Sequence, residues 1–313
     1  MAVTLVEAAK QTSGDVKRSA VIEMFARNSP LLQRLTWMNI PGAVYSYNKE
    51  GKLPSLGFRG INDPYTDKSI GILNPESEAL KILGKEIEVD GAMIKMYGPS
   101  VRTQQELMVF KAAIHKTTSK IINGDSIANP LEYDGLRRRV VGGQLFSATG
   151  DNTNGALRLE MLDAAIDAVP GANGIICNKA FARKLTKAAK NRDIAGGDIT
   201  YGKDQFGQRV AEYNSIPLII VERDEDEREI IDFNEVGPAG AGAGADCMSA
   251  YVANFGDGKF HGIQNGILEV EDLGKMQSKN AFLTRFEWLA SIAVPDGRAV
   301  ARIRGITNAD FVA

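Results

Sequence analysis

Apolar side chains recur at intervals of three and four residues along the middle of the chain. The series lies on one face of an α-helix and comprises Leu107, Phe110, Ile114, Thr117 and Ile121. A helix over residues 100–122 would be roughly 30 Å long at the α-helical rise per residue, which suits a structural spine. Shorter runs with the same period predict two short helices within residues 5–35 and further helices at 156–169 and 179–191.

Other stretches alternate or run continuously in apolar residues, which predicts strands. Residues 78–96 carry two such runs around an Asp90-Gly91 turn signal. Further strands are expected at 174–177, 216–221, 228–233 and 250–255. Near the C-terminus, residues 281–294 and 299–306 predict two long strands joined by a Pro-Asp-Gly turn.

Residues 38–77 contain no helical pattern and many prolines and glycines. Short strand patterns at both ends predict a long two-stranded hairpin, and the charged residues of the connection include Lys49, Lys52, Arg59, Asp63 and Lys68. A long irregular segment is unusual inside a compact domain, and an isolated hairpin is only marginally stable in water. We therefore expect this hairpin to pack on another subunit through these charged residues.

The stretch INGDSIANPLEYDGLRRRV, residues 122–140, concentrates turn signals. Gly124 is expected to end the spine helix in a left-handed conformation, and Asp125 and Gly135 complete the expected hinge. The three arginines that follow, Arg137, Arg138 and Arg139, are expected at a subunit contact. Their suggested partner is a neighbour's acidic loop, residues 222–229, which contains Asp224 and Glu225.

Composition narrows the function classes. The chain has 313 residues, a formal net charge of -2 and 24% charged residues. A dedicated DNA-binding domain would need clustered Lys and Arg, which occur only at the arginine triplet. No run reaches the length of a membrane helix, and Cys177 and Cys247 form no CxxC pair, as expected of buried free thiols.

Motifs that would carry catalysis are missing from the sequence. The loop GPAGAGAGAD lacks the GxGxxG spacing, and no Walker motif or GxSxG elbow occurs. The only histidines, His115 and His261, have no neighbours at metal-ligand spacing, and Glu86 and Glu88 are expected on one exposed strand face. We therefore expect no catalytic residues, no cofactor and no metal site.

The order of these elements resembles the major capsid proteins of tailed bacteriophages, which have the Hong Kong 97-type fold. Four stretches resemble one subgroup: VTLVEAAK at 3–10, GKLPSLGFRGIN at 51–62, INGDSIANPLEYDGL at 122–136 and YNSIPLIIV at 213–221. The resemblance implies an α+β fold with an N-terminal arm at 1–37 and an extended E-loop at 38–77. It further implies a discontinuous P-domain at 78–135 and 265–313, and an α/β A-domain at 136–264.

The same resemblance implies self-assembly as hexamers and pentamers into an icosahedral shell that encloses double-stranded DNA without sequence specificity. Other implied partners are a separate scaffolding protein, a portal protein and, left open, a decoration protein, with no membrane partner. The implied location is the virion, after assembly in the host cytoplasm. Lysine–asparagine crosslinks, known in some relatives, are not expected here because no partner asparagine or activating glutamate can be matched to Lys49, Lys52 or Lys68.

Two alternatives stay open. An encapsulin-like compartment shell shares the same fold, and a cytoplasmic α/β enzyme would use the 136–264 section. Electron microscopy separates shells from a small oligomer, and neighbouring genes separate the two kinds of shell.

Overall fold

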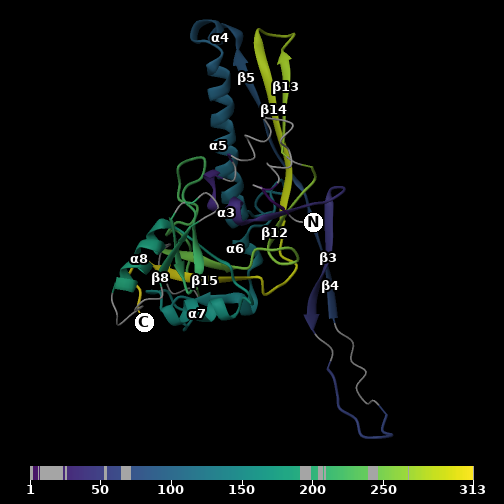
Figure 1. The fold of residues 1–313 in the computed structure, drawn as a ribbon, viewed down its shortest axis with the longest axis vertical. Helices are drawn as coiled ribbons and strands as arrows, with labels where there is room; N and C mark the ends of the chain where they lie inside the picture. Colours follow the sequence, from purple (N-terminus) through teal and green to yellow (C-terminus); the bar gives the residue numbers. More distant parts are fainter. Residues whose placement is uncertain are drawn as a thin grey trace.

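The computed structural model describes residues 3–5, 7, 24, 27–52, 55–64, 72–190, 199–203, 207, 209–238, 246–266 and 268–312. Two β-sheets, one long helix and a projecting hairpin make up this part of the chain (Figure 1). The α+β class expected from the sequence is confirmed.

The first sheet is built around one long strand, β14 (Ala281–Ala293). One edge of β14 pairs with β5 (Lys81–Asp90) over residues 281–290, and the other pairs with β13 (Glu269–Lys275) and β12 (His261–Gln264). The sheet continues from β12 to β2 (Thr36–Asn39) and β1 (Val3–Thr4). Residues near the start of the chain therefore lie beside residues near its end.

The second sheet has seven strands in the order β6-β15-β11-β7-β10-β9-β8. Their bounds are Leu145–Ser147 (β6), Val300–Thr307 (β15), Cys247–Ala253 (β11), Gly174–Cys177 (β7), Ile216–Ile220 (β10), Arg209–Tyr213 (β9) and Ile199–Lys203 (β8). Helices α7 (Leu159–Asp167) and α8 (Lys179–Lys190) lie against this sheet (Figure 1). As expected, Asn178 caps α8, because its side chain accepts a hydrogen bond of 2.8 Å from the Phe181 N–H.

The long helix α5 (Ser100–Asn123) stands beside β5, β13 and β14 and leads down to the second sheet (Figure 1). Its buried side chains belong to the C-terminal two thirds of the helix, where the tilted rings of Phe110 and Phe286 contact each other with centroids 5.6 Å apart. Leu107, expected on the apolar face, is 43% exposed. The spine predicted from the sequence is confirmed. Its first turns have no fully buried side chain and contact the first sheet through polar groups, with Arg102 donating to Thr284 at 2.7 Å.

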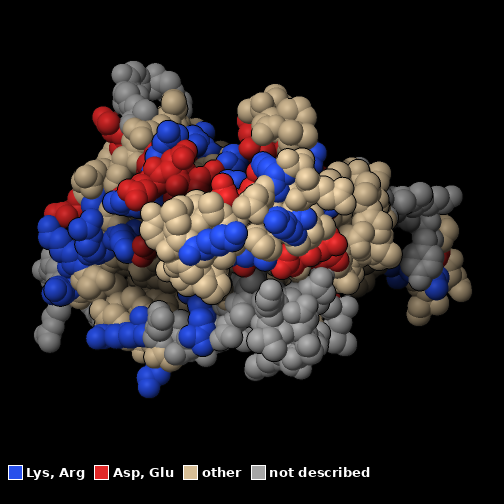
Figure 2. Space-filling view, turned by 90° about the horizontal axis from the view of Figure 1, so that it is seen from above, with Lys and Arg blue, Asp and Glu red and all other residues tan. Residues whose placement is uncertain are grey.

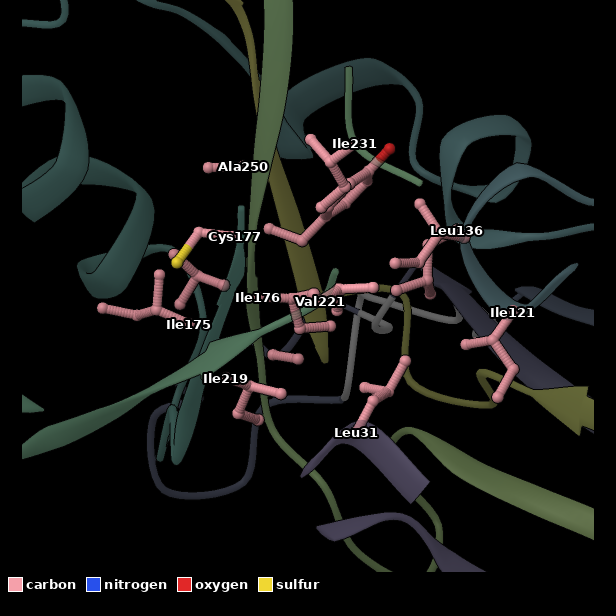
Figure 3. Packing of buried hydrophobic residues seen from close by; sticks show 14 of the residues in the cluster. Leu31, Ile121, Leu136, Ile175, Ile176, Cys177, Ile219, Val221, Ile231 and Ala250 are labelled. Carbon is pink, nitrogen blue, oxygen red and sulfur yellow. The ribbon is translucent and has the colours of Figure 1, made fainter. Parts of the chain in front are cut away.

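One apolar core joins the two sheets. Figure 3 shows Leu31 from α3 (Pro30–Arg34) and Ile121 from α5 in the same buried cluster as Ile219 of β10 and Val221, which follows β10. Trp37 and Trp288, which are both buried, contact each other in the first sheet, with ring centroids 4.7 Å apart and ring planes inclined by 49°. The short helices α6 (Leu136–Arg139) and η1 (Gly142–Gln144) connect α5 to β6.

The hairpin consists of β3 (Val44–Lys52) and β4 (Ile72–Ala79), which pair with each other and with no other strand in the described ranges. It extends away from both sheets (Figure 1). The second arm, expected at residues 69–73, lies partly outside the described residues, and β4 extends further than expected, to Ala79. The expected helices of residues 5–35 also lie largely outside the described residues.

Three local predictions are wrong. Residues 91–97 form the helix α4 (Gly91–Tyr97) and not a strand, because the Asp90 side chain caps the helix by accepting from the Ala92 N–H at 2.8 Å. Gly124 has φ −56° and is not left-handed. Residues 228–233 form no strand beyond the isolated bridge between Arg223 and Glu229. Side-chain oxygens of Asp224 and Asp232 accept nearby backbone N–H groups and bend the chain there.

The two C-terminal strands expected at 281–294 and 299–306 are confirmed as β14 and β15. They lie in different sheets, because β14 belongs to the first sheet and β15 pairs with β11 and β6 in the second. The Pro-Asp-Gly segment at 295–297 therefore carries the chain from one sheet to the other. Of the segment 265–313, β13 and β14 join β5 in the first sheet, whereas β15 belongs to the second.

Candidate subunit-contact surfaces

The tip of the hairpin is exposed along its whole described length. Leu56, Phe58 and Ile61 are 92%, 109% and 95% exposed. A turn fixes the tip: Arg59 donates a 3.0 Å hydrogen bond to the Asp63 carbonyl, and Asn62 has φ 67°, a left-handed value that asparagine tolerates. Exposed apolar patches are typical of contact surfaces, and the tip's role in a subunit contact stays a prediction. Arg59 and Asp63 thus shape the tip from within.

Charged and phenolic groups link the two strands of the hairpin base to each other. The Tyr47 hydroxyl donates to Glu76 at 3.0 Å and to Glu78 at 3.3 Å. Burial, then the Glu78 carboxylate and the hydrogen bond to Glu76, raise the pKa of Tyr47 well above its usual range. Lys49 lies 3.6 Å from Glu76. The side chain of Lys52 and the whole of Lys68 lie outside the described residues.

Arg139 connects that base to the joint after α5. Its guanidinium pairs with both oxygens of Glu78, with Nη2 2.7 Å from Oε2, and it donates to the Asp134 carbonyl at 2.6 Å. Burial disfavours the charged guanidinium, but the hydrogen bonds and attraction to Glu78 outweigh it and raise the pKa of Arg139. A bidentate arginine–carboxylate pair fixes orientation as well as distance.

The other two arginines also pair within the chain. Arg137 Nε lies 3.1 Å from Glu235 Oε1, and Arg138 pairs with Asp125 and, at 3.3 Å, with Asp134. Glu235 is buried and also pairs with Arg302. In the group formed by Arg137, Arg302 and Glu235, two positive charges therefore face one negative charge. These contacts give all three arginines a role inside one subunit. Their expected role at a subunit contact stays a prediction.

The joint itself depends on two glycines for a reason other than the one expected. The Gly135 N–H donates to the Gly124 carbonyl at 2.8 Å, which brings the two backbones together. A Cβ on Gly124 would lie 2.3 Å from the Tyr133 carbonyl oxygen, and one on Gly135 would lie 2.6 Å from the Ile122 carbonyl oxygen. Close backbone approach, and not a positive φ, therefore requires glycine here. The Asp125 side chain accepts from the Ile127 N–H at 2.9 Å and closes the turn.

The acidic loop 222–229 is an exposed turn, as expected for a solvated segment. Glu225 pairs with Lys116 of α5 in the same chain, and the Asp224 side chain accepts from the Arg228 N–H at 2.9 Å. Neither Asp224 nor Glu225 contacts the arginine triplet, so their proposed pairing would need a second copy.

The surface also carries a concentration of positive charge. Figure 2 shows lysine and arginine gathered at the left of the molecule, on the side where α8 lies in Figure 1.

Groups with catalytic or metal-binding potential are scattered or buried. Within the described ranges, no three His, Cys, Asp or Glu residues lie together as metal ligands do. Cys177 and Cys247 are buried free thiols, and burial raises the pKa of Cys177 to about 12. His261 is buried against the edge of Tyr45, and burial lowers its pKa. Glu86 and Glu88 pair with Arg285 and Lys279 on the exposed strand face.

Sequence reasoning missed the partners that organise the joint. Glu78 and Tyr47 lie far from Arg139 in the sequence, and Glu235 lies far from Arg137, so no local motif indicates these contacts.

Among the helices that the structure describes, none combines the length and apolarity that crossing a membrane would require.

No protein-family model matches this sequence, and no curated protein matches it either. Solved structures, by contrast, are similar over nearly the whole chain. The holo-SrpI encapsulin complex from Synechococcus elongatus PCC 7942 has a TM-score of 0.66 at 16% identity, covering 90% of this chain and 89% of that one. The capsid of a native GTA particle has a TM-score of 0.59 at 12% identity, covering 91% of both chains.

A phage structure completes the comparison. Microbacterium phage Oxtober96 has a TM-score of 0.59 at 12% identity, covering 89% of this chain and 90% of that one. At such identities the likeness concerns the fold, and it agrees with the two sheets, long helix and projecting hairpin described above. This chain therefore has the Hong Kong 97-type fold, which it shares with phage and GTA capsid structures and with an encapsulin.

Proposed function

We propose that this chain is a shell subunit, the major capsid protein of a tailed double-stranded DNA phage. It assembles with copies of itself as hexamers and pentamers into an icosahedral shell around the genome. Its place is the virion, after assembly in the host cytoplasm, and its role is structural and not catalytic.

The observation that carries this proposal is the hairpin β3–β4. Its tip presents Leu56, Phe58 and Ile61 almost fully exposed, at the end of two strands that pair with nothing else in the described chain. Exposed apolar side chains on an extended arm are costly in a monomer and are typical of an interface. A neighbouring copy supplies the surface that covers them.

A second exposed apolar region supports the same conclusion. At the far end of the molecule, around α4 and the start of α5, Met96, Tyr97 and Met108 are 68%, 69% and 64% exposed. The molecule thus carries uncovered apolar groups at both ends of its long axis (Figure 1). Such a distribution suits a subunit with neighbours on several sides better than a monomeric enzyme.

Charge is consistent with a shell that encloses DNA without reading its sequence. The net charge is -2, so the subunit has no overall attraction for phosphates. Proposed partners besides other copies are a scaffolding protein, a portal protein and a decoration protein.

An encapsulin-like compartment is the second candidate. The observation in its favour is the TM-score of 0.66 with an encapsulin, against 0.59 with the native GTA capsid and the Oxtober96 structure. Both candidates are shells, and they differ in content. A capsid contains double-stranded DNA, whereas a compartment of the encapsulin type contains protein cargo.

Electron microscopy of the purified full chain, with and without a co-expressed scaffolding protein, tests the proposal. Closed hollow particles support a shell subunit. Nuclease-protected DNA inside particles from the native source supports the capsid, and enclosed protein supports the compartment. A monodisperse monomer or dimer under all conditions, especially with a saturable small-molecule site in residues 136–264, overturns the shell proposal in favour of an enzyme.

A further inference from the structure

A cleft of about 410 Å³ lies between the N-terminal helix α3, the long helix α5 and strand β10. Its floor is the strand end from Leu218 to Val221, and Ser29 and Thr118 close one side, joined by a 2.9 Å hydrogen bond between their hydroxyls. The shell proposal makes no use of this cleft.

The strand on the floor has an open backbone edge. β10 pairs in parallel with β7 over Leu218, Ile219 and Ile220, and the Val221 N–H donates to the Cys177 carbonyl at 2.9 Å. Backbone groups of successive strand residues point to alternate sides. Since Val221 and Ile219 face β7, the N–H and C=O of Ile220 face the opposite side.

The edge of β10 that faces away from β7 has no strand partner at Ile220 in the described part of the chain. β9 pairs with β10 only at Ile216–Tyr213 and Pro217–Glu212, and the hairpin β8–β9 then diverges. Beyond Pro217, no strand in the described part of the chain pairs with this edge of β10. A strand edge with unpaired N–H and C=O groups is a template for an added strand.

The rim of the cleft is cationic. Arg34, Arg209 and Arg223 line it, and in the part of the chain that the structure describes no carboxylate lies within 4.0 Å of their guanidinium nitrogens. Arg209 stacks over the Tyr201 ring at 3.7 Å, which holds its guanidinium in place. The lining carboxylate, Glu222, is paired with Lys179 at 2.6 Å. The rim therefore attracts negative charge.

From the open edge and the cationic rim together, we propose that this cleft binds an acidic peptide segment of a partner protein, added as a strand alongside β10. Main-chain hydrogen bonds to Ile220 give the segment its extended conformation, and carboxylates paired with Arg34 and Arg223 give it its charge preference. A volume of about 410 Å³ accommodates a short segment and not a folded domain. All residues that line the cleft belong to one subunit, so the cleft would be present in either kind of shell.

Fluorescence anisotropy with a labelled peptide of three Glu-Val repeats tests the inference on the full chain. We expect saturable binding that weakens at least about tenfold in the double variant Arg34→Gln, Arg223→Gln, and binding unchanged in the control Arg298→Gln, whose exposed side chain lies outside the cleft. Unfolding curves of the three proteins establish that each is folded.

Backbone recognition has its own readout. In a strand, alternate N–H groups face the same side, so N-methylation of either the valines or the glutamates, but not both, should abolish binding. Hydrogen exchange at Ile220 should slow when the unmethylated peptide binds.

Three results overturn the inference: no saturable peptide binding, equal binding by the double variant, or insensitivity to both methylation patterns. Displacement of the peptide by a thymidine hexanucleotide at lower concentration would instead assign the arginines to nucleic-acid phosphates, and it would equally overturn an acidic peptide as the ligand.

Discussion

Arg139 Nη2 lies 2.7 Å from Glu78 Oε2. This contact connects the base of the projecting hairpin to the segment that follows the long helix α5. Both side chains are largely buried, at 13% and 16% exposed. The same carboxylate accepts from Tyr47 at 3.3 Å, so one acidic group holds both strands of the hairpin base. The direction in which the hairpin leaves the body therefore depends on this pair.

Replacing Arg139 by alanine should destabilise the unassembled subunit by about 3 kcal/mol, because a buried carboxylate loses its partner. The control is Arg137→Ala, since the Arg137 side chain is 45% exposed and its loss should cost less than about 1 kcal/mol. Urea denaturation of both variants provides the comparison. Equal free energies of unfolding would show that the Glu78 pair does not hold the hairpin.

Gly124 is the second position where a single change should matter. In Gly124→Ala the new Cβ would meet the carbonyl oxygens of Tyr133 and Lys120, so we expect a loss of more than about 2 kcal/mol. Gly143→Ala is the matched control, because a Cβ there meets nothing within 4 Å. Thermal melts of the two variants should differ clearly, and coincident melting temperatures would contradict the close backbone approach.

The hairpin tip should matter for assembly and not for folding. Changing Leu56, Phe58 and Ile61 together to serine removes apolar surface that is exposed in one subunit, so the free energy of unfolding should change by less than about 0.5 kcal/mol. Sedimentation velocity should show that assembly is lost. If instead the triple variant assembles normally, the tip is not an interface.

A pH effect follows from Asp296. Burial acts to raise its pKa, but the hydrogen bond from Lys259 and that from the Arg298 N–H outweigh burial, and the net pKa lies below the usual 3.8. A depressed folded-state pKa contributes stability above pH 4 that is lost as the pH falls further. Asp296→Asn should therefore be less stable than the parent chain near pH 7, by under about 1 kcal/mol, and the difference should shrink as the pH falls below 4.

Urea titrations at several pH values measure that difference. Asp226→Asn, in the exposed loop 222–229, is the control and should change stability little at any pH. A constant gap between the parent chain and Asp296→Asn from pH 7 to pH 3 would assign the effect to packing and not to charge.

Local patterns carried much of the fold. The helical period placed α5 to within a residue of its end, and the Asn178 cap and the strand at 174–177 follow from neighbouring residues alone. The Asp90-Gly91 pair led to a wrong prediction of a strand after residue 91, because aspartate before glycine suits a helix cap as well as a hairpin turn. The separation of β14 and β15 into two sheets depends on tertiary packing. The Pro-Asp-Gly segment between them is compatible with pairing of the two strands and with their separation.

The contact residues were harder to predict than the fold. Exposure of the hairpin tip follows from its composition, since residues 38–77 lack the apolar content to bury themselves. The partners of the arginine triplet depend on pairs such as Arg139 and Glu78, which only the folded chain brings together. The open edge of β10 depends on where β9 diverges, and no residue type signals that point.

Cryo-electron microscopy of assembled particles, at a resolution that shows side chains, tests the central claim most directly. The account predicts a closed shell in which residues 55–64 of each hairpin lie against a neighbouring subunit, with Leu56, Phe58 and Ile61 buried there. Particles whose hairpin tips remain in solvent, or a full-length chain that forms no particles with its scaffolding protein present, would contradict it.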